Sequence, residues 1–229
     1  MDAFARSGIN TVEGNLTIGG EDEENPVTNL DGLKNLVSVR CDLTITAAYT
    51  GETLAGLENL TACESLRIGS AAHPNETLRQ LSLPALKEIK GDLCVYGTAL
   101  QTADFKSLQS VAGHFVLQSD ALLQLTADEL TTVAGNMTLI GTTADEAKAP
   151  CEQMYFPKLQ RIDGTLTLSR FDRLSGLGTT FGVLTQAGAL RYEHLALANT
   201  FEFPLIETTG NITVTDCPIL RSVLLPALT

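Results

Sequence analysis

The sequence contains no tryptophan, and aromatic residues make up only 5% of its 229 residues. Apolar residues nevertheless reach 44%, so a core must be built chiefly from aliphatic side chains. No stretch of about 18 consecutive apolar residues occurs, and we therefore expect no segment that inserts into a membrane. By length alone the chain could hold one or two ordinary domains.

Basic residues are also scarce. The chain has 15 Lys and Arg residues against 27 Asp and Glu residues, which gives a formal net charge of −12 and a pI near 4.6. Phosphate backbones and anionic membrane surfaces repel such a chain, so nucleic acid is not expected as a partner. Residues 21–24 are four consecutive acids, and they lack the alternation of a calcium loop. We expect a solvated loop there.

Cysteines number five, and no two have the CxxC spacing of a zinc site. Because five is odd, at least one cysteine has no partner within the chain. Cys151 takes an apolar position of the repeat described below, where a small buried side chain is expected. Cys41 and Cys63 fall in adjacent repeats, where a disulfide and simple filling of the core both remain open. The sequence predicts no metal site and no cofactor.

What the sequence has in abundance is one spacing of apolar residues around a glycine. It is clearest in residues 156–168, FPKLQRIDGTLTL, and returns in residues 83–95, 105–117 and 127–139. Gly91, Gly113 and Gly135 follow one another at intervals of 22 residues. A fixed period in the twenties is typical of a solenoid, in which each repeat covers the apolar edge of its neighbour.

Each repeat contains three short apolar runs, which predicts a coil with three sides. The run after the glycine, such as Leu93-Cys94-Val95, alternates inward and outward side chains and predicts a strand with one buried face. Steps of three, as in Leu83, Leu86 and Ile89, fit bent or extended segments at corners. No coil leaves room for a helix. Strands from successive coils should therefore stack into one long parallel sheet.

The repeat covers nearly the whole chain, so residues 1–229 are expected to form a single domain of about nine coils of 22 or more residues. Cys41 and Ser65 replace the glycine in two coils. Close packing or a bulge therefore explains the recurring glycine better than a requirement for positive φ does. The glycine positions are Gly14, Cys41, Ser65, Gly91, Gly113, Gly135, Gly164, Gly188 and Gly210.

The last residues begin a tenth coil with Leu220, Val223, Leu225 and Leu228. An uncapped solenoid end exposes an apolar edge and unpaired backbone groups. We therefore expect the natural chain to continue beyond Thr229, or this end to pack against another molecule, including end-to-end self-association.

One known family shares this spacing. Phe156, Pro157, Leu159, Ile162, Gly164 and Leu166 resemble the repeat of the receptor L domain family, which is leucine-rich-repeat-like and includes ligand-binding repeats of insulin and epidermal growth factor receptors. Residues 9–18, INTVEGNLTI, are similar to the opening coil of that family. The resemblance implies a mainly β, right-handed parallel β-helix-like solenoid, and the hand agrees with the usual crossover of parallel strands. Those receptors close their ends with disulfides, and no cysteine lies near residue 1, so growth-factor binding is not carried over.

The same resemblance implies a place outside the cytoplasm. Residues 1–10, MDAFARSGIN, lack the basic stretch and apolar core of a signal peptide. The chain is then either intracellular or the mature part of a secreted or cell-surface protein with an added Met1, and the resemblance favours the second. Among the sequons at Asn15, Asn59, Asn75, Asn136 and Asn211, only Asn75 is expected as an acceptor, and only in a eukaryotic secretory pathway.

The outward residues of the expected sheet fall into two columns, which are chiefly structural because Asn and Thr pair well with like residues on the next strand. The first column is Asn15, Asp42, Asp92, His114, Asn136, Thr165 and Asn211. The second column is Thr17, Thr44, Arg67, Cys94, Val116, Thr138, Thr167, Arg191 and Thr213. Exposed apolar residues flanked by polar ones often mark a contact surface. The candidate binding site is therefore Tyr96, His114, Val116 and Ile140, which should lie together on the middle coils.

Two functions remain in different classes. The first is a non-catalytic binding or adhesion scaffold for an unidentified protein or glycan, which would use the sheet face or the loops after the first, third and sixth coils. The second is a β-helical enzyme acting on polysaccharides, which would need clustered carboxylates or a base on the outer surface. Asp92 and His114 are neighbours, with Lys90 one column away, but Asp42 is two coils from Asp92. The sequence therefore favours the non-catalytic scaffold.

Overall fold

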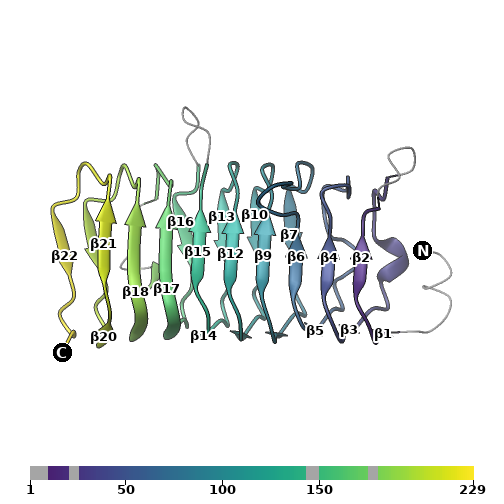
Figure 1. Ribbon diagram of the computed structural model, residues 1–229, viewed down its shortest axis with the longest axis horizontal. Coiled ribbons are helices and arrows are strands. Elements are labelled where there is room, and N and C mark those ends of the chain that lie inside the picture. The colour runs from purple at the N-terminus through teal and green to yellow at the C-terminus, as the bar shows by residue number, and fades with distance from the viewer. Residues whose placement is uncertain (1–9, 21–25, 143–149, 175–179) are drawn as a thin grey trace.

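A computed structural model describes residues 10–20, 26–142, 150–174 and 180–229. The chain is mainly β, with 38% strand and 2% helix, and its all-parallel sheets stack as a solenoid of about nine turns of roughly 23 residues. Figure 1 shows the strands side by side along one long axis, with the strands of the first and last coils at opposite ends of the stack. The solenoid predicted from the repeat is confirmed.

The longest row of strands follows the glycine position, as the alternating pattern predicts, and we call it the main sheet. Each strand pairs in parallel with the equivalent strand of the next coil. Its members are β2 (Leu16–Ile18), β4 (Leu43–Ile45), β6 (Leu66–Ile68), β9 (Leu93–Tyr96), β12 (Phe115–Gln118), β15 (Met137–Ile140), β17 (Arg161–Ser169), β18 (Gln186–Glu193) and β21 (Ile212–Thr215).

The other two sides of the coils also contain short parallel strands, where the sequence predicted only bent or extended segments. In β17 and β18 two sides join in one continuous strand. The side before the glycine holds β1 (Thr11–Val12), β3 (Ser38–Val39), β5 (Ala62–Cys63), β8 (Glu88–Ile89), β11 (Ser110–Val111), β14 (Thr132–Val133) and β20 (Thr208–Thr209). The third side holds β7 (Gln80–Ser82), β10 (Thr102–Asp104), β13 (Gln124–Thr126), β16 (Gln153–Tyr155), β19 (Thr200–Glu202) and β22 (Ser222–Leu224). A single turn of 3-10 helix, η1, spans Asp31–Leu33.

The interior is one continuous core. Leu93, Phe115, Met137 and Leu166 are in register on four successive strands and fully buried, as the repeat predicts. Burying one such side chain contributes about 1.5–3 kcal/mol. Most of the described aromatic residues are also buried. The rings of Phe105, Phe115, Phe156, Phe181 and Phe203 form a chain with centroids 5.5–6.5 Å apart.

We number the coils by the order of their glycine positions along the chain. The glycine position of coil three was predicted to be Ser65, and this is wrong. The backbone N–H at this position donates to the carbonyl of the equivalent residue one coil earlier, as from Gly113 to Gly91 at 2.8 Å. In coil three the residue that accepts from Gly91, at 2.6 Å, is Glu64 and not Ser65. Coil three has one residue fewer between its strands, so the sequence alone could place the deletion on either side.

The reason for the glycines is close approach. Among the described residues the glycines with positive φ are Gly19, Gly56 and Gly69, and none of these occupies the glycine position of the repeat. The preference for tight packing over a positive φ is therefore confirmed.

The last described strand, β22, pairs with β19 in the register expected of a tenth coil. Val223, Leu224 and Leu228 are 40–46% exposed, whereas Leu220 and Leu225 pack against the core. Association of this end stays a prediction. The acids at residues 21–24 lie outside the described residues, as do residues 143–149, where the sequence before Cys151 is about seven residues longer than the repeat requires. Within the described part of the chain, no helix is long and apolar enough to cross a membrane.

Candidate functional site

The outward face of the main sheet carries both predicted columns. The pairing register runs from Thr17 through Thr44, Arg67 and Cys94 to Val116, and then onward to Thr213, and confirms every neighbour of the second column. These side chains stand on adjacent strands, so the column is a continuous strip along the solenoid.

Most of the first column forms a ladder of hydrogen bonds from backbone N–H groups to side chains. The Oδ1 atom of Asp92 accepts from the backbone N–H of His114 at 2.9 Å, and the Nδ1 atom of His114 accepts from the N–H of Asn136 at 2.9 Å. The same bond joins Asn136 to the N–H of Thr165, Ser65 to that of Asp92, and Asn15 to that of Asp42. Short side chains with an acceptor atom thus fix the register of successive coils. The column has a structural role, as predicted, but its bonds run to the backbone of the next coil and not between like side chains. The sequence missed Ser65 as a member because coil three is one residue shorter.

Asp92 and His114 are engaged in structural contacts. The other oxygen of Asp92, Oδ2, lies 3.4 Å from Nη2 of Arg67, and Nε of Arg67 lies 3.9 Å from Oδ2 of Asp42. A guanidinium therefore separates the two carboxylates, which belong to coils two and four. Coil three lies between them, as the sequence predicts. Both Nδ1 of His114 and Oδ1 of Asp92 already serve the ladder.

The predicted binding residues lie on three adjacent strands. Tyr96, Gln118 and Ile140 are direct neighbours in register on β9, β12 and β15. Val116 lies two residues before Gln118 on the same face, and these four side chains are half-buried. His114 is exposed and lies two residues further back, next to Val116 but away from Tyr96 and Ile140. We call Tyr96, Val116, Gln118 and Ile140 the contact patch; the sequence missed Gln118 because a glutamine there looks like an ordinary surface residue.

Burial shifts the pKa of two groups, one in this patch and one beside it. It raises the pKa of the Cys94 thiol and of the Tyr96 phenol. Cys94 is therefore protonated at neutral pH and is a poor nucleophile, because the thiolate is the reactive form. Within the described residues, no group of three or more His, Cys, Asp or Glu residues could hold a metal ion.

The five cysteines are all free thiols. Cys63 is buried and in register with Val39 and Ile89, whereas Cys41 is exposed and its thiol donates to the carbonyl of Glu13 at 3.7 Å. Filling of the core, and not a disulfide, is therefore the role of Cys63. Cys151 is fully buried, as predicted.

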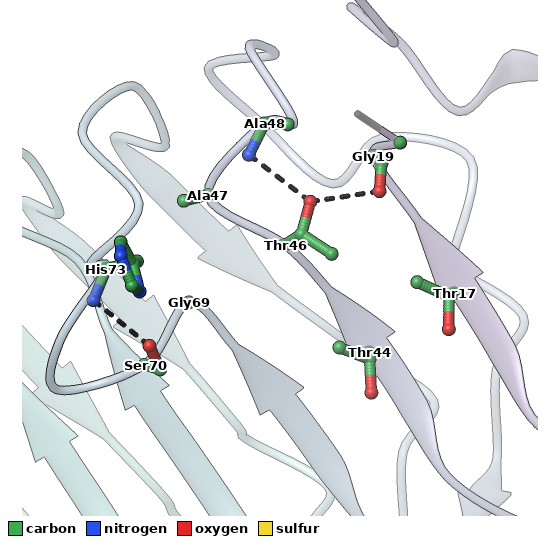
Figure 2. A pocket seen from close by; sticks show the side chains of 10 residues that line it. Thr17, Gly19, Thr44, Thr46, Ala47, Ala48, Gly69, Ser70 and His73 are labelled. Carbon is green, nitrogen blue, oxygen red and sulfur yellow. Dashed lines mark hydrogen bonds between the residues drawn. The ribbon is translucent and has the colours of Figure 1, made fainter. Parts of the chain in front are cut away.

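A hollow of about 740 Å³ opens on the same face over coils one to three, beside the loops after the first and third coils, although the sequence singled out no residue there (Figure 2). Its floor includes Thr17 on β2 and Thr44 on β4, and its rim includes the turn after β4 and the loop that carries His73. Gly19 and Gly69 stand at the position that Tyr96 takes in the contact patch. A Cβ atom would lie 2.9 Å from the backbone N of Tyr49 at Gly19 and 2.7 Å from that of Asn75 at Gly69, so the turn after β4 and the loop of His73 pack closely against these glycines. The lining residues are Thr17, Gly19, Gly20, Thr44, Thr46, Ala47, Ala48, Gly69, Ser70 and His73.

The expectation for Asn75 is wrong. This side chain is fully buried, and its Nδ2 donates to the carbonyls of Tyr49 at 2.8 Å and Thr46 at 3.2 Å. Its Oδ1 accepts from the backbone N–H of Leu78 at 2.8 Å and of Thr77 at 3.1 Å. Asn75 joins the loops of coils two and three, and a glycan on Nδ2 is incompatible with this packing.

Comparison of the chain with protein-family models, with curated proteins and with solved structures finds no match. The function of the chain must therefore be inferred from the geometry of the main sheet.

Proposed function

We propose that the chain is a non-catalytic binding or adhesion scaffold that acts outside the cytoplasm, secreted or at a cell surface. The observation that carries the proposal is the contact patch, in which Tyr96, Val116 and Ile140 lie half-buried on a face otherwise made of polar columns. The spacing of the repeat supports a relationship to receptor L domains, and with it the extracellular setting. The ligand is a protein or a glycan.

The patch has the composition of an interface centre. Aromatic residues are enriched in binding hot spots, and energetically important contacts cluster where water is excluded by a surrounding rim. Here the rim is supplied by the Asn, Asp and Thr columns, which can hydrogen-bond a partner. Because a stable protein complex buries about 1,200–2,000 Å² in total, the partner must extend along the sheet beyond the patch.

The polysaccharide enzyme has less support. Glycoside hydrolysis needs two free carboxyl groups on either side of the scissile bond. On this face Asp42 and Asp92 both pair with Arg67, and Asp92 also accepts the ladder bond from His114. We therefore propose no catalytic role for Asp92, His114 or Lys90.

The test is capture of purified extracellular domains and glycans on an array by the labelled protein, with variants that change only the patch. We expect Tyr96→Lys and Val116→Asp to weaken capture at least tenfold. Tyr155→Lys is the matched control, because Tyr155 is 48% exposed on β16, on a different side of the coils. Equal loss in Tyr96→Lys and Tyr155→Lys, or no capture by the unaltered protein, would contradict the proposal.

A separate assay addresses catalysis. A panel of polysaccharides is incubated with the protein and with Asp92→Asn, and new reducing ends are measured. Asparagine already serves the ladder at Asn15 and Asn136, so this variant should fold. We expect no cleavage by either protein; cleavage that disappears in Asp92→Asn would support the enzyme instead.

A further inference from the structure

We infer that the hollow over coils one to three is a second binding site, which takes a neutral oligosaccharide. It adjoins the contact patch, since Gly69 packs against the backbone of Tyr96, with 2.5 Å between the carbonyl oxygen of Tyr96 and the position of a Cβ atom on Gly69. The two surfaces nevertheless use different side chains. The inference does not depend on the contact patch.

The chemistry of the lining suits a sugar ring, which presents hydroxyl groups at its edges and C–H groups on its faces. Thr17 and Thr44 project from neighbouring strands of the same face (Figure 2). Neither hydroxyl bonds to another described residue. The imidazole of His73 likewise has no partner among the described residues. The methyl groups of Thr17 and Thr44, with those of Ala47 and Ala48, supply apolar contact. A few polar groups in a mostly apolar hollow are what fixes the orientation of a small ligand.

The charge of the lining selects a neutral ligand. None of the ten lining residues is Asp, Glu, Lys or Arg, although the chain as a whole carries a net charge of −12. An anionic polysaccharide would meet no cation in the hollow and would be repelled by the surrounding acidic surface. Among the described lining residues, a cationic ligand would find no carboxylate.

The backbone around the hollow disfavours an extended peptide. A peptide strand gains most of its affinity by adding main-chain hydrogen bonds to a free sheet edge. The hollow lies over the face of the sheet, and β4 at its floor already pairs with a strand on each side. What this face offers is hydroxyl and imidazole groups, and these match the alternating donors and acceptors of a saccharide.

The other polar groups at the rim are already used, and they hold the walls in place. The hydroxyl of Thr46 donates to the carbonyl of Gly19 at 3.0 Å and accepts from the N–H of Ala48 at 3.2 Å (Figure 2). The hydroxyl of Ser70 accepts from the N–H of His73 at 3.0 Å. The turn and the loop are therefore fixed independently of a ligand, so the hollow is preformed, which lowers the entropic cost of binding.

The experiment measures binding by calorimetry, with neutral hexasaccharides of glucose, mannose and galactose as probes and hexagalacturonate as the anionic comparison. At least one neutral probe should bind, and hexagalacturonate should bind at least tenfold more weakly. Ala47→Trp fills the hollow from an exposed position and should weaken binding at least tenfold. Thr17→Val with Thr44→Val removes the two free hydroxyls at constant shape and should weaken it several-fold.

Two controls separate this site from the rest of the molecule. Ala112→Trp places the same bulk at another exposed alanine, and Tyr96→Lys disrupts the contact patch; both should bind the neutral probe as the unaltered protein does. Circular dichroism checks that each variant is folded. The inference is overturned if no neutral probe binds, if hexagalacturonate binds better, or if Ala47→Trp binds as tightly as Ala112→Trp. Loss of binding in Tyr96→Lys alone would assign the sugar to the contact patch instead.

Discussion

Gly113 packs directly against Asp92 of the preceding coil. A Cβ atom at Gly113 would clash with Oδ1 of Asp92 and would lie 2.7 Å from the carbonyl oxygen of Gly91. That same Oδ1 accepts the hydrogen bond from the N–H of His114. The recurring glycine and the first column therefore act together. The missing side chain of Gly113 makes room for the side-chain acceptor of Asp92, which fixes the register of the next coil.

Replacing such a glycine should cost stability only where a coil precedes it. Overpacking a closely packed position costs about 1–3 kcal/mol, and we expect a loss of this size in the free energy of unfolding for Gly113→Ala. Gly14 is the matched control, because a Cβ atom there would have no described neighbour within 4 Å. Urea denaturation of both variants measures the difference. Equal losses in Gly113→Ala and Gly14→Ala would show that backbone conformation, and not contact between coils, selects the glycine.

The ladder also fixes the form of one histidine. Since Nδ1 of His114 accepts from the N–H of Asn136, the neutral ring must carry its proton on Nε2. Nitrogen NMR of the labelled protein at alkaline pH should find this tautomer. His114→Ala should lower the free energy of unfolding by about 0.5–1.5 kcal/mol, the usual contribution of one hydrogen bond, and His114→Asn should restore it. An Nδ1–H tautomer, or an asparagine variant no better than alanine, would argue against the ladder.

Replacing Asn75 should lower the stability of the fold more than replacing the asparagine of any other sequon. Its replacement by alanine removes the acceptor for the buried N–H of Leu78 and the donor that joins two loops, so we expect a loss of at least about 2 kcal/mol, since each buried group left unpaired costs about 1–3 kcal/mol. Asn59→Ala is the control, because Asn59 is exposed and makes one hydrogen bond, to Lys34. Thermal denaturation compares the two variants. In material from a secretory host, peptide mapping should find Asn75 unmodified in the folded fraction.

The sequence predicted the fold because the information for a solenoid is local and repeated. Leu93, Phe115 and Met137 obey the same spacing in every coil, so one correct interpretation assigns many residues at once. Errors arose where a coil departs from the period. The residue missing near Ser65 could be placed on either side of that serine, and only the pairing of Glu64 with Gly91 decides.

The sites were less predictable than the fold, because they depend on how loops of different coils lie against one another. Tyr96 and Ile140 could be placed on one face from strand alternation alone. The hollow beside them is bordered by the turn after β4 and the loop that carries His73, and nothing in the sequence shows how these two segments lie over the sheet. Asn75 appeared to be a loop sequon, since nothing local reveals that its amide bonds to a different coil.

Buried thiols should make the fold sensitive to alkali. Burial, with smaller contributions from the charges of Asp42 and Glu64, raises the pKa of Cys63 from 9.0 to about 12, and burial raises that of Cys151 to about 11. Below pH 9 both thiols are protonated in the folded and unfolded states, so their ionisation does not affect stability. Between pH 9 and the raised values only the unfolded chain ionises, and its stabilisation lowers the free energy of unfolding as the pH rises, by up to about 1.4 kcal/mol per pH unit for each thiol.

Cys63→Val and Cys151→Leu test this dependence, because valine and leucine are the residues that equivalent coils carry at these positions, as at Val39 and Leu122. We expect the double variant to lose less stability than the unaltered protein between pH 9 and pH 11, measured by urea denaturation in a reducing buffer. At neutral pH the two proteins should differ little, since the replacements suit the same core. An identical alkaline slope in both proteins would mean that other groups cause it, and that these thiols are accessible to water in the folded chain.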